Sequence, residues 1–275
     1  MNGLTIATGK EEVRISRADG SLVLTHRLPA AARPHFHPII APDGKGVMTE
    51  DKPAHHIWQQ GLYTGFNLVN GIGFWRNEPQ DGSFSPRLEG TPRIVNGGAR
   101  WALSNPWRHP DGSPMIDETQ SWSLDIADDH FVLELDWGLR AEIDIEIGQF
   151  MAGGLFLRMP WTPETGASAL NSEGQADKDA EKQRARWLAV AMPLEGRSDE
   201  AGMAIMDHPS NPMHPTTWRM DNEFGISPSR VIAGSWKIPK GTTDRYRFRI
   251  YVFCGAINSA AIDRQWQEFA NSQEL

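Results

Sequence analysis

Apolar and polar residues alternate along most of this chain. The pattern is clearest in EEVRIS (11–16), SLVLTHRL (21–28), HFVLELDW (130–137), EIDIEI (142–147) and RYRFRIYVF (245–253). A period of two places the apolar side chains on one face of a strand, and Gly and Pro residues separate these segments. Helices do not alternate with the strands, as a parallel α/β sheet would require. The pattern predicts an all-β fold, a large antiparallel sandwich of two sheets of the jelly-roll or supersandwich type.

One segment near the C-terminus has a different period. Ile262, Trp266 and Phe269 follow one another at spacings of four and three residues, which places them on one side of a helix. We expect a C-terminal helix over about 257–272 that packs across the sandwich. The polar run 171–186 is expected to be an exposed loop or a short helix, and it could cover a site. The chain has no internal repeat and no clear linker, so one domain over 1–275 is predicted.

Composition narrows the classes of function. The 35 acidic and 27 basic residues give a net charge of −8, which disfavours binding to nucleic acid or to an anionic membrane surface. No window holds the roughly 18 apolar residues of a membrane-spanning helix, and the N-terminus lacks the pattern of a signal peptide. The single cysteine, Cys254, allows no internal disulfide. We therefore expect a cytoplasmic protein with neither a nucleic-acid nor a membrane partner.

Histidines gather in three connections that are rich in proline. These are RPHFHP (33–38), DKPAHHIW (51–58) and DHPSNPMHP (207–215). In an extended segment His35 and His37 point to the same side, a spacing by which a strand offers two imidazoles to one metal. A single histidine in such a loop more often hydrogen-bonds the loop itself. Three such loops together predict one shared pocket at an edge of the sandwich, formed by His37, His56, His208 and His214.

Tryptophans and carboxylates in similar connections are further candidates. An indole face suits the apolar face of a sugar ring, and its N–H can bond a hydroxyl. We expect at least one such ring to line the pocket, although each could instead wedge a loop onto the sandwich; they are Trp58, Trp75, Trp107 and Trp218. A carboxylate near an imidazole fixes its tautomer or joins it in proton transfer. The carboxylates in comparable contexts are Glu118, Glu173 and Asp207.

Several motifs resemble a known family. Six segments carry the resemblance, and they occur in order between about Arg33 and the end of the chain. They are RPHFHPIIAPDGKGV, HHIWQQGLYTGFNLVNGIGFW, GGLFLRMP, NSEG, ARW and DHPSNPMHPTTW. They resemble the bacterial PmoA-related family, often labelled "methane oxygenase PmoA". Membrane methane monooxygenase needs spanning helices, which this sequence does not predict, so copper-dependent methane oxidation is excluded. The resemblance instead implies a β-sandwich protein of bacterial sugar-catabolic gene neighbourhoods.

The resemblance also implies site positions. The residues that match the family's motifs are Arg33, His37, His56, Asn70, Glu173, Asp207, His208, Asn211, His214 and Trp218. One position departs from the family's pattern, because Gln59 stands where relatives often have a second histidine before Gly-Leu. Glutamine binds metals poorly, which weakens the expectation of a metal site built on both histidines.

The function expected from these observations is carbohydrate processing. We predict an enzyme, of the lyase, hydrolase or epimerase type, that acts on a sugar or keto-glycoside by acid–base chemistry. The expected catalytic residues are His37, His56, Glu173, Asp207, His208 and His214. The expected substrate-binding residues are Arg33, Asn70, Trp75, Glu118, Asn211 and Trp218.

Two other classes stay open. One is a sugar-binding or accessory protein without turnover, and the other is a metalloenzyme whose divalent metal is held by histidines. The leading hypothesis needs no cofactor. Its partner is a small-molecule carbohydrate, and the sequence leaves open whether the protein forms a homo-oligomer.

Overall fold

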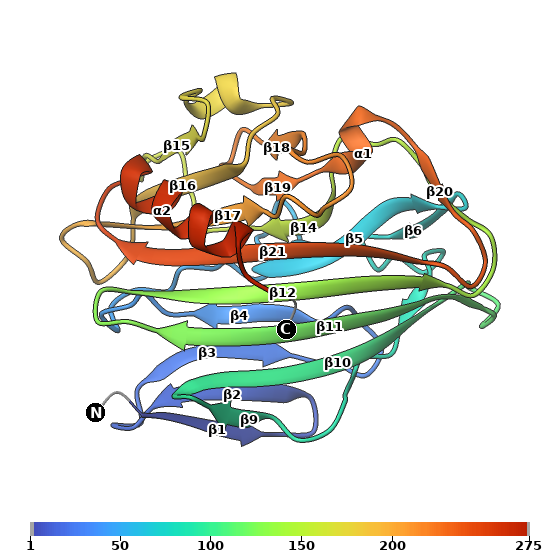
Figure 1. Cartoon of the computed structure of the whole chain (residues 1–275), viewed down its shortest axis with the longest axis horizontal. Helices are drawn as coiled ribbons and strands as arrows, with labels where there is room; N and C mark the ends of the chain where they lie inside the picture. The colour runs from blue at the N-terminus through green and yellow to red at the C-terminus, as the bar shows by residue number, and fades with distance from the viewer. Residues whose placement is uncertain (1–2, 274–275) are drawn as a thin grey trace.

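Two large antiparallel sheets stack face to face in this protein (Figure 1). The structure is a computed structural model that describes residues 3–273, so the ends of the expected domain 1–275 lie outside the described residues. The prediction of an all-β sandwich with two antiparallel sheets is confirmed.

The first sheet has 11 strands and begins with the N-terminal hairpin. Its main order is β1-β2-β3-β4-β5-β14-β19-β18, while β6 pairs with β5, and β13 pairs with β5 and β20. The bounds are β1 (Leu4–Thr8), β2 (Glu12–Arg17), β3 (Leu22–Arg27), β4 (His35–Ile39), β5 (Leu62–Val69), β6 (Ile72–Phe74), β13 (Ile145–Ile147), β14 (Gly153–Leu157), β18 (Trp218–Met220), β19 (Ile226–Pro228) and β20 (Trp236–Ile238).

The second sheet has 10 strands, several of them long. Its main order is β15-β16-β17-β21-β12-β11-β10-β7, and the short strands β8 and β9 also pair with β10. The bounds are β7 (Ser83–Phe84), β8 (Arg87–Leu88), β9 (Arg93–Val95), β10 (Gly98–Arg108), β11 (Pro114–Ile126), β12 (His130–Ala141), β15 (Ser168–Asn171), β16 (Trp187–Pro193), β17 (Glu200–Asp207) and β21 (Thr243–Cys254).

The core lies between the two sheets and follows the alternation of the sequence. On β12, Phe131, Leu133 and Leu135 point inward and are fully buried, as are Leu62 and Val69 on β5. One continuous cluster of buried apolar side chains includes residues from Val13 to Val252. Because inward and outward positions alternate, the outer face of each sheet is left for other side chains.

Three short helical segments accompany the sheets. They are the 3-10 helix η1 (Asp177–Ala180), α1 (Arg230–Ala233) and α2 (Ser259–Ala270). The expected C-terminal helix is therefore confirmed, and the Asn258 side chain caps it by accepting a hydrogen bond from the Ala261 N–H at 3.1 Å. Among residues 3–273, no helix has the length and apolar character needed to cross a membrane.

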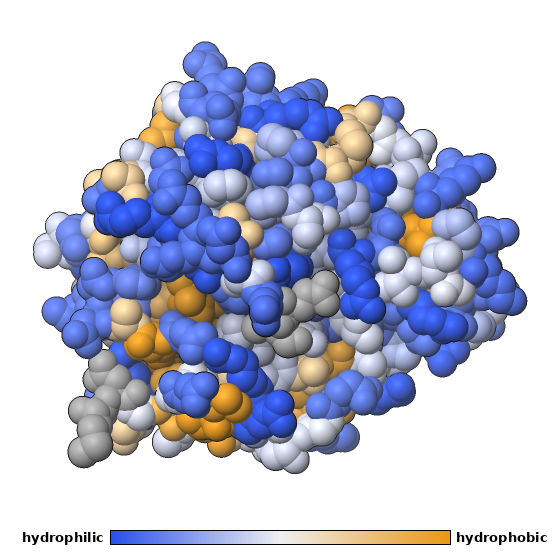
Figure 2. All heavy atoms as spheres, in the orientation of Figure 1, coloured by the Kyte–Doolittle hydropathy of each residue, from blue (hydrophilic) through white to orange (hydrophobic). Residues whose placement is uncertain are grey.

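Helix α2 covers part of the outer face of the 10-stranded sheet. Figure 1 shows the helix in front of β17 and β21. Ile262 and Phe269 are buried there against Trp187, Met206 and Tyr251. Figure 2 shows that this face of the molecule is mainly hydrophilic, with apolar residues gathered mostly in its lower half. The two outer faces thus differ, because one carries a helix and the other carries the pocket described next.

Candidate functional site

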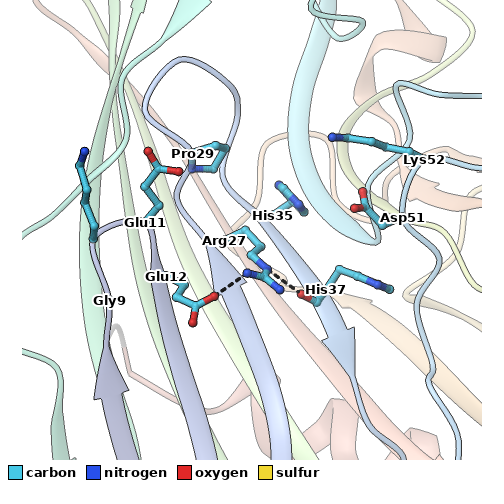
Figure 3. A pocket seen from close by; sticks show the side chains of 10 residues that line it. Gly9, Glu11, Glu12, Arg27, Pro29, His35, His37, Asp51 and Lys52 are labelled. Carbon is cyan, nitrogen blue, oxygen red and sulfur yellow. Dashed lines mark hydrogen bonds and ion pairs between the residues drawn. The ribbon is translucent and has the colours of Figure 1, made fainter.

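A pocket of 560 Å³ opens on the outer face of the 11-stranded sheet (Figure 3). Its lining comes from β2, β3 and β4 and from the segment after residue 50: Gly9, Lys10, Glu11, Glu12, Arg27, Pro29, His35, His37, Asp51 and Lys52. His35 and His37 both face it because Phe36, between them, points into the core. The expectation that these two imidazoles share one side of a strand is confirmed.

A row of cross-strand neighbours explains how the sheet positions these groups. Glu12 pairs with Arg27, Arg27 with His35, His35 with Tyr63, and Tyr63 with Phe156. Directly paired residues on neighbouring strands point to the same face of a sheet. The row therefore brings a carboxylate, a guanidinium, an imidazole, a phenol and a phenyl ring to one outer face. Glu12 and Arg27 also form an ion pair at 2.5 Å.

The hydrogen bonds of His35 fix its tautomer. Its Nδ1 lies 3.2 Å from the Arg33 carbonyl oxygen, which can only accept, so Nδ1 carries the proton and Nε2 keeps a lone pair. His35 is only 6% exposed. Burial lowers its pKa to about 4, against the raising effect of its bond to Arg33. His35 is therefore a neutral imidazole at pH 7, with Nε2 as its basic nitrogen.

His37 has a different kind of partner. The Thr49 hydroxyl accepts from the Ile39 N–H at 3.1 Å and lies 3.1 Å from His37 Nδ1. A hydroxyl both donates and accepts, so this contact orients the ring and is compatible with a proton on either of its nitrogens. Burial lowers the pKa of His37, while the Asp51 charge raises it. One pocket thus presents two imidazoles, and His35 has its tautomer fixed with Nε2 as the basic nitrogen.

Asp51 links this pocket to a buried arginine. Its charge raises the pKa of His35, His37 and Arg33, and its Oδ1 is buried without a hydrogen-bond partner among residues 3–273. Arg33 has no exposed surface, and its guanidinium lies 3.8 Å above the centre of the Tyr63 ring. Tyr63 packs in turn with Trp75 and Phe156, and Trp58 covers the edge of this aromatic cluster.

A second polar cluster surrounds the buried Arg158. Its Nη1 donates to Glu223 Oε2 at 2.5 Å, and its Nε donates to Glu50 Oε2 at 3.0 Å. His55 Nε2 and His56 Nδ1 lie 3.0 and 3.2 Å from the same Glu223 oxygen. The charges of Arg33 and Arg158 both lower the pKa of Tyr63, although burial raises it more. This Arg158 cluster therefore lies on the same outer face as the pocket.

His55, His56 and Glu223 are the one group of side chains in residues 3–273 that could hold a metal ion, since their ligand atoms all lie within 4.8 Å of one another. Two imidazoles and a carboxylate suit Zn²⁺ or Fe²⁺. Arg158 already neutralises the Glu223 carboxylate, and its Nη2 lies 3.0 Å from His55 Nε2. A metal would therefore have to bind beside a guanidinium, so this donor set fits a cation only in part.

The Asp207 loop, residues 207–216, is a separate structure. It follows β17 and contains the expected residues Asp207, His208, Asn211 and His214. Asp207 is 1% exposed and accepts hydrogen bonds from Asn211 Nδ2 at 2.8 Å, His214 Nδ1 at 2.8 Å and the Thr216 N–H at 2.9 Å. Its backbone carbonyl accepts from the indole of Trp266 on α2 at 2.9 Å.

The two histidines of this loop are held by its own contacts. His208 lies 2.7 Å from the Ser210 hydroxyl and 2.9 Å from Arg247 Nη1. Burial, followed by the Arg247 charge, lowers the pKa of His208 to about 4. His214 stacks on Trp266 with ring centres 6.0 Å apart. Both imidazoles tie the loop to α2 and β21.

The structure does not bring the four predicted histidines together in one pocket. His37 lines the pocket of Figure 3, and His56 belongs to the Arg158 cluster. His208 and His214 contact α2 or β21 on the other sheet. The three histidine-containing segments have similar sequences because all of them are proline-rich connections. They are nevertheless attached to strands of different sheets, so their histidines lie apart.

Glu118, predicted to bind substrate, is fully buried between the sheets. Its two oxygens accept from five side chains of β5, β10, β11 and β12: Thr64, Asn105, Trp107, Gln120 and Trp137, at 2.6 to 2.9 Å. Its lone pairs are therefore occupied within the core, and the prediction was wrong.

The four tryptophans fall into two groups. Trp107 and Trp218 have no exposed surface, and the Trp218 indole donates to the Ala185 carbonyl at 2.8 Å, so a platform role for Trp218 was wrong. Trp75 lines a neighbouring pocket of 320 Å³ with Asp81 and Arg76. Trp58 is partly exposed and has Arg76 over its ring at 4.6 Å. None of the four lines the pocket of His35 and His37.

Two further predicted residues have local partners away from the pocket. Asn70 lies in the turn between β5 and β6 with a φ of 50°, donates to the Asp144 carbonyl at 2.9 Å and accepts from the Glu146 N–H at 2.6 Å. Glu173 is exposed after β15, where it accepts from Ser172 at 2.9 Å. Both contacts stabilise loops, and neither residue lines the pocket.

Sequence reasoning missed several residues of this outer face: Asp51, His55, Tyr63, Arg158 and Glu223. Asp51 and His55 lie in a segment that had been singled out, so the concentration of polar residues there was the available signal. Glu223 lies 168 residues from His55 along the chain, and only the tertiary fold brings the two together.

Several solved structures show a distant similarity to this chain. No curated protein matches it. A galactose 1-epimerase from Lactobacillus acidophilus is 8% identical with a TM-score of 0.45, and the match covers 93% of this chain and 100% of the epimerase.

Two α-galactosidases also match. The enzyme from Geobacillus stearothermophilus, solved with stachyose, is 8% identical with a TM-score of 0.46, over 93% of this chain and 41% of that one. The enzyme from Lactobacillus brevis is 10% identical with a TM-score of 0.38, over 94% of this chain and 40% of that one. The chain thus spans about two fifths of the α-galactosidases.

A family profile gives the stronger match. Residues 15–267, nearly the whole chain, match "Family of unknown function (DUF6807)". The chain therefore belongs to the DUF6807 family.

Proposed function

We propose that this protein is an enzyme that binds a carbohydrate in the pocket of His35 and His37 and moves protons on it. The observation that carries the proposal is the pair of imidazoles that line one pocket, of which His35 has its proton held on Nδ1 and a basic Nε2. Charged and hydrogen-bonding side chains line the pocket, which suits a ligand rich in hydroxyl groups. The motifs shared with a sugar-catabolic family agree with this ligand class.

The two histidines have distinct roles in this proposal. His35 Nε2 removes a proton from the sugar or keto-sugar, and the His37 imidazole donates one to the oxygen on which charge develops. The nearby Asp51 carboxylate raises the pKa of both rings and stabilises the imidazolium formed on His35. Epimerisation and β-elimination both begin with such a proton removal, and glycoside hydrolysis also needs an acid and a base.

The test is a turnover and isotope-exchange assay. Sugars, sugar acids and 3-keto-glycosides are incubated with the protein in D₂O, and NMR follows both product formation and deuterium entering C–H positions. We expect turnover with at least one compound, and a loss of about 10²–10⁴-fold in His35→Gln and in His37→Gln. His109→Gln, at a partly exposed histidine outside the pocket, is the matched control.

The outcomes separate the remaining alternatives. Exchange that is lost in both pocket variants but kept in the control supports the proposal. Binding of a sugar without turnover or exchange by the wild type favours a non-catalytic sugar-binding protein. Turnover retained in both variants would exclude this histidine pair as acid and base.

A metalloenzyme is the second candidate, and the grouping of His55, His56 and Glu223 is the observation that favours it. Elemental analysis of the purified protein, followed by calorimetric titration of the metal-free protein with Zn²⁺ and Fe²⁺, tests this. Stoichiometric metal that is lost in His56→Gln, but kept in His214→Gln, would support the metal site. Its absence from the wild type would leave Arg158 as the cation of this cluster.

A further inference from the structure

Arg33 differs from every other buried arginine of the described chain. Arg158 contacts Glu50 and Glu223, Arg197 contacts Asp43 and Asp199, Arg247 contacts Asp136, and Arg249 contacts Glu134, all within 4.0 Å. Arg33 is 0% exposed, yet no carboxylate oxygen of residues 3–273 lies within 4.0 Å of its guanidinium. A buried charge without a close counter-charge is costly, so this arginine calls for an anionic partner.

The contacts of Arg33 leave one particular edge of the guanidinium free. Nη1 donates to the Trp75 carbonyl, and the flat face stacks on Tyr63. Nε and Nη2 are buried and have no hydrogen-bond partner among residues 3–273. These two nitrogens form the edge whose parallel N–H groups match the two oxygens of a carboxylate. The protein thus fixes the orientation of the guanidinium and leaves its carboxylate-binding edge available.

Residues that line the proposed substrate pocket also interact with Arg33. The Arg33 carbonyl holds His35 Nδ1, and the charge of Arg33 lowers the pKa of His35. The Tyr63 ring lies beneath the same guanidinium, and its hydroxyl is another buried group without a partner in residues 3–273. The Asp51 and Asp81 charges also act on Arg33, but neither residue forms a close ion pair with it. Arg33 itself does not line the pocket, whereas His35 and Asp51, which both interact with it, do.

We infer that Arg33 receives the carboxylate of the ligand, so that the substrate class is acidic sugars such as uronates and their keto derivatives. This inference rests on the proposed function, because it assigns a substrate to the same pocket. Two N–H groups of Arg33 bind the carboxylate oxygens, and the Tyr63 hydroxyl donates a further hydrogen bond. The sugar ring extends from there toward His35 and His37.

The covering segment must move for this binding to occur. Residues 52–59 form a loop closed by the Lys52 N–H to Gln59 carbonyl bond at 2.7 Å, and Trp58 in this loop packs on the aromatic cluster of Tyr63 and Trp75. Because Arg33 is fully buried, a carboxylate binds only when part of its surroundings moves, and we assign this movement to loop 52–59.

The experiment compares acidic and neutral sugars of the same shape. Calorimetry measures the binding of D-glucuronate and D-glucose, and of D-galacturonate and D-galactose, to the wild type, Arg33→Lys and Arg33→Met. We expect one uronate to bind about tenfold or more tightly than its neutral partner, and both variants to lose this preference. Arg33→Lys keeps the positive charge but lacks the two parallel N–H groups of the guanidinium. It therefore still tests the inference if Arg33→Met does not fold.

Arg197→Lys is the matched control, because Arg197 is a largely buried arginine already paired with two aspartates, and the preference should survive there. Equal binding of acidic and neutral sugars by the wild type would overturn the inference and leave the proposed function standing. A preference that persists in both Arg33 variants would also overturn it. No binding of any of these four sugars, and no turnover in the assay above, would overturn both proposals.

Discussion

The His35–His37 pocket and the Asp207 loop begin from similar sequences and end in opposite states. Each is a proline-rich connection with two histidines and an aspartate at hand. In the Asp207 loop the carboxylate has three close hydrogen-bond donors, and α2 packs against the loop. In the pocket, Asp51 Oδ1 has no hydrogen bond from residues 3–273, and the rings face a cavity. Saturated groups stabilise the fold, whereas unsaturated buried groups indicate a ligand.

The strongest test of this comparison measures both turnover and thermal stability in one histidine variant from each region. We expect His37→Gln to lower turnover by about 10²–10⁴-fold with little change in melting temperature, because His37 faces the pocket. His214→Gln should do the reverse, since His214 bonds Asp207 and stacks on Trp266. Thermal unfolding and turnover per folded molecule are measured for both. Large loss of turnover in folded His214→Gln would return catalysis to the Asp207 loop.

The two aspartates should differ in their effect on folding. Asp207→Asn places an amide NH₂ where the Asn211, His214 and Thr216 donors converge, so we expect a loss of about 2–4 kcal/mol in the free energy of unfolding. Asp51→Asn should change it by less than about 1 kcal/mol, because Oδ1 has no protein donor to lose. Urea unfolding of both variants decides this, and equal losses would contradict the distinction between the two regions.

Acid should destabilise both regions through their buried histidines. The pKa of His35 and that of His208 are lowered from 6.5 to about 4 in the folded protein. The unfolded chain therefore binds more protons between these values, and stability is fully present above pH 6.5 and lost as pH falls toward 4. His35→Gln should reduce the slope of stability against pH by up to about 1.4 kcal/mol per unit. An unchanged slope would show that His35 titrates normally.

The smallest expected effect concerns the indoles. Trp266→Phe removes the hydrogen bond to the Asp207 carbonyl, so we expect a loss of about 1 kcal/mol in unfolding free energy and unchanged turnover. Trp58→Phe keeps an aromatic ring on loop 52–59 against Tyr63 and Trp75, so we expect near-wild-type stability and a smaller fluorescence change when a uronate binds. If the fluorescence change is the same in Trp58→Phe, loop 52–59 does not report on binding.

The sequence predicted the fold well because both of its main signals are local. Alternation within strands such as β12 and β21 requires only neighbouring residues, and so does the spacing of Ile262, Trp266 and Phe269 in α2. The shared side of His35 and His37 followed from the same rule. These predictions needed no knowledge of which strands pair.

The candidate site was harder to predict because it depends on pairing and burial. Nothing in the sequence distinguishes Arg33, which lacks a close counter-charge, from Arg158, which meets Glu223 65 residues further along the chain. Glu118 is in phase with the apolar Ile116 and Trp122 on β11, so alternation placed it on the inner face, but the sequence did not show that donors from neighbouring strands surround it. The four histidines were predicted to share a pocket because their loops have similar sequences. Their positions in the structure depend instead on which sheet each loop belongs to.

The hydrogen bonds to the buried Glu118 carboxylate also provide a way to monitor whether the two sheets are packed together. Its donors come from both sheets, with Thr64 on the 11-stranded sheet and the Trp107 and Trp137 indoles on the 10-stranded sheet. Those indole protons are bonded to one carboxylate and have no route to water while the sheets stay together, so they should exchange with solvent only when the sandwich opens as a whole. Their two NMR signals would then follow global unfolding, while amide signals from loop 52–59 would follow local opening. The relative rates of the two would show whether the pocket can open without loosening the core.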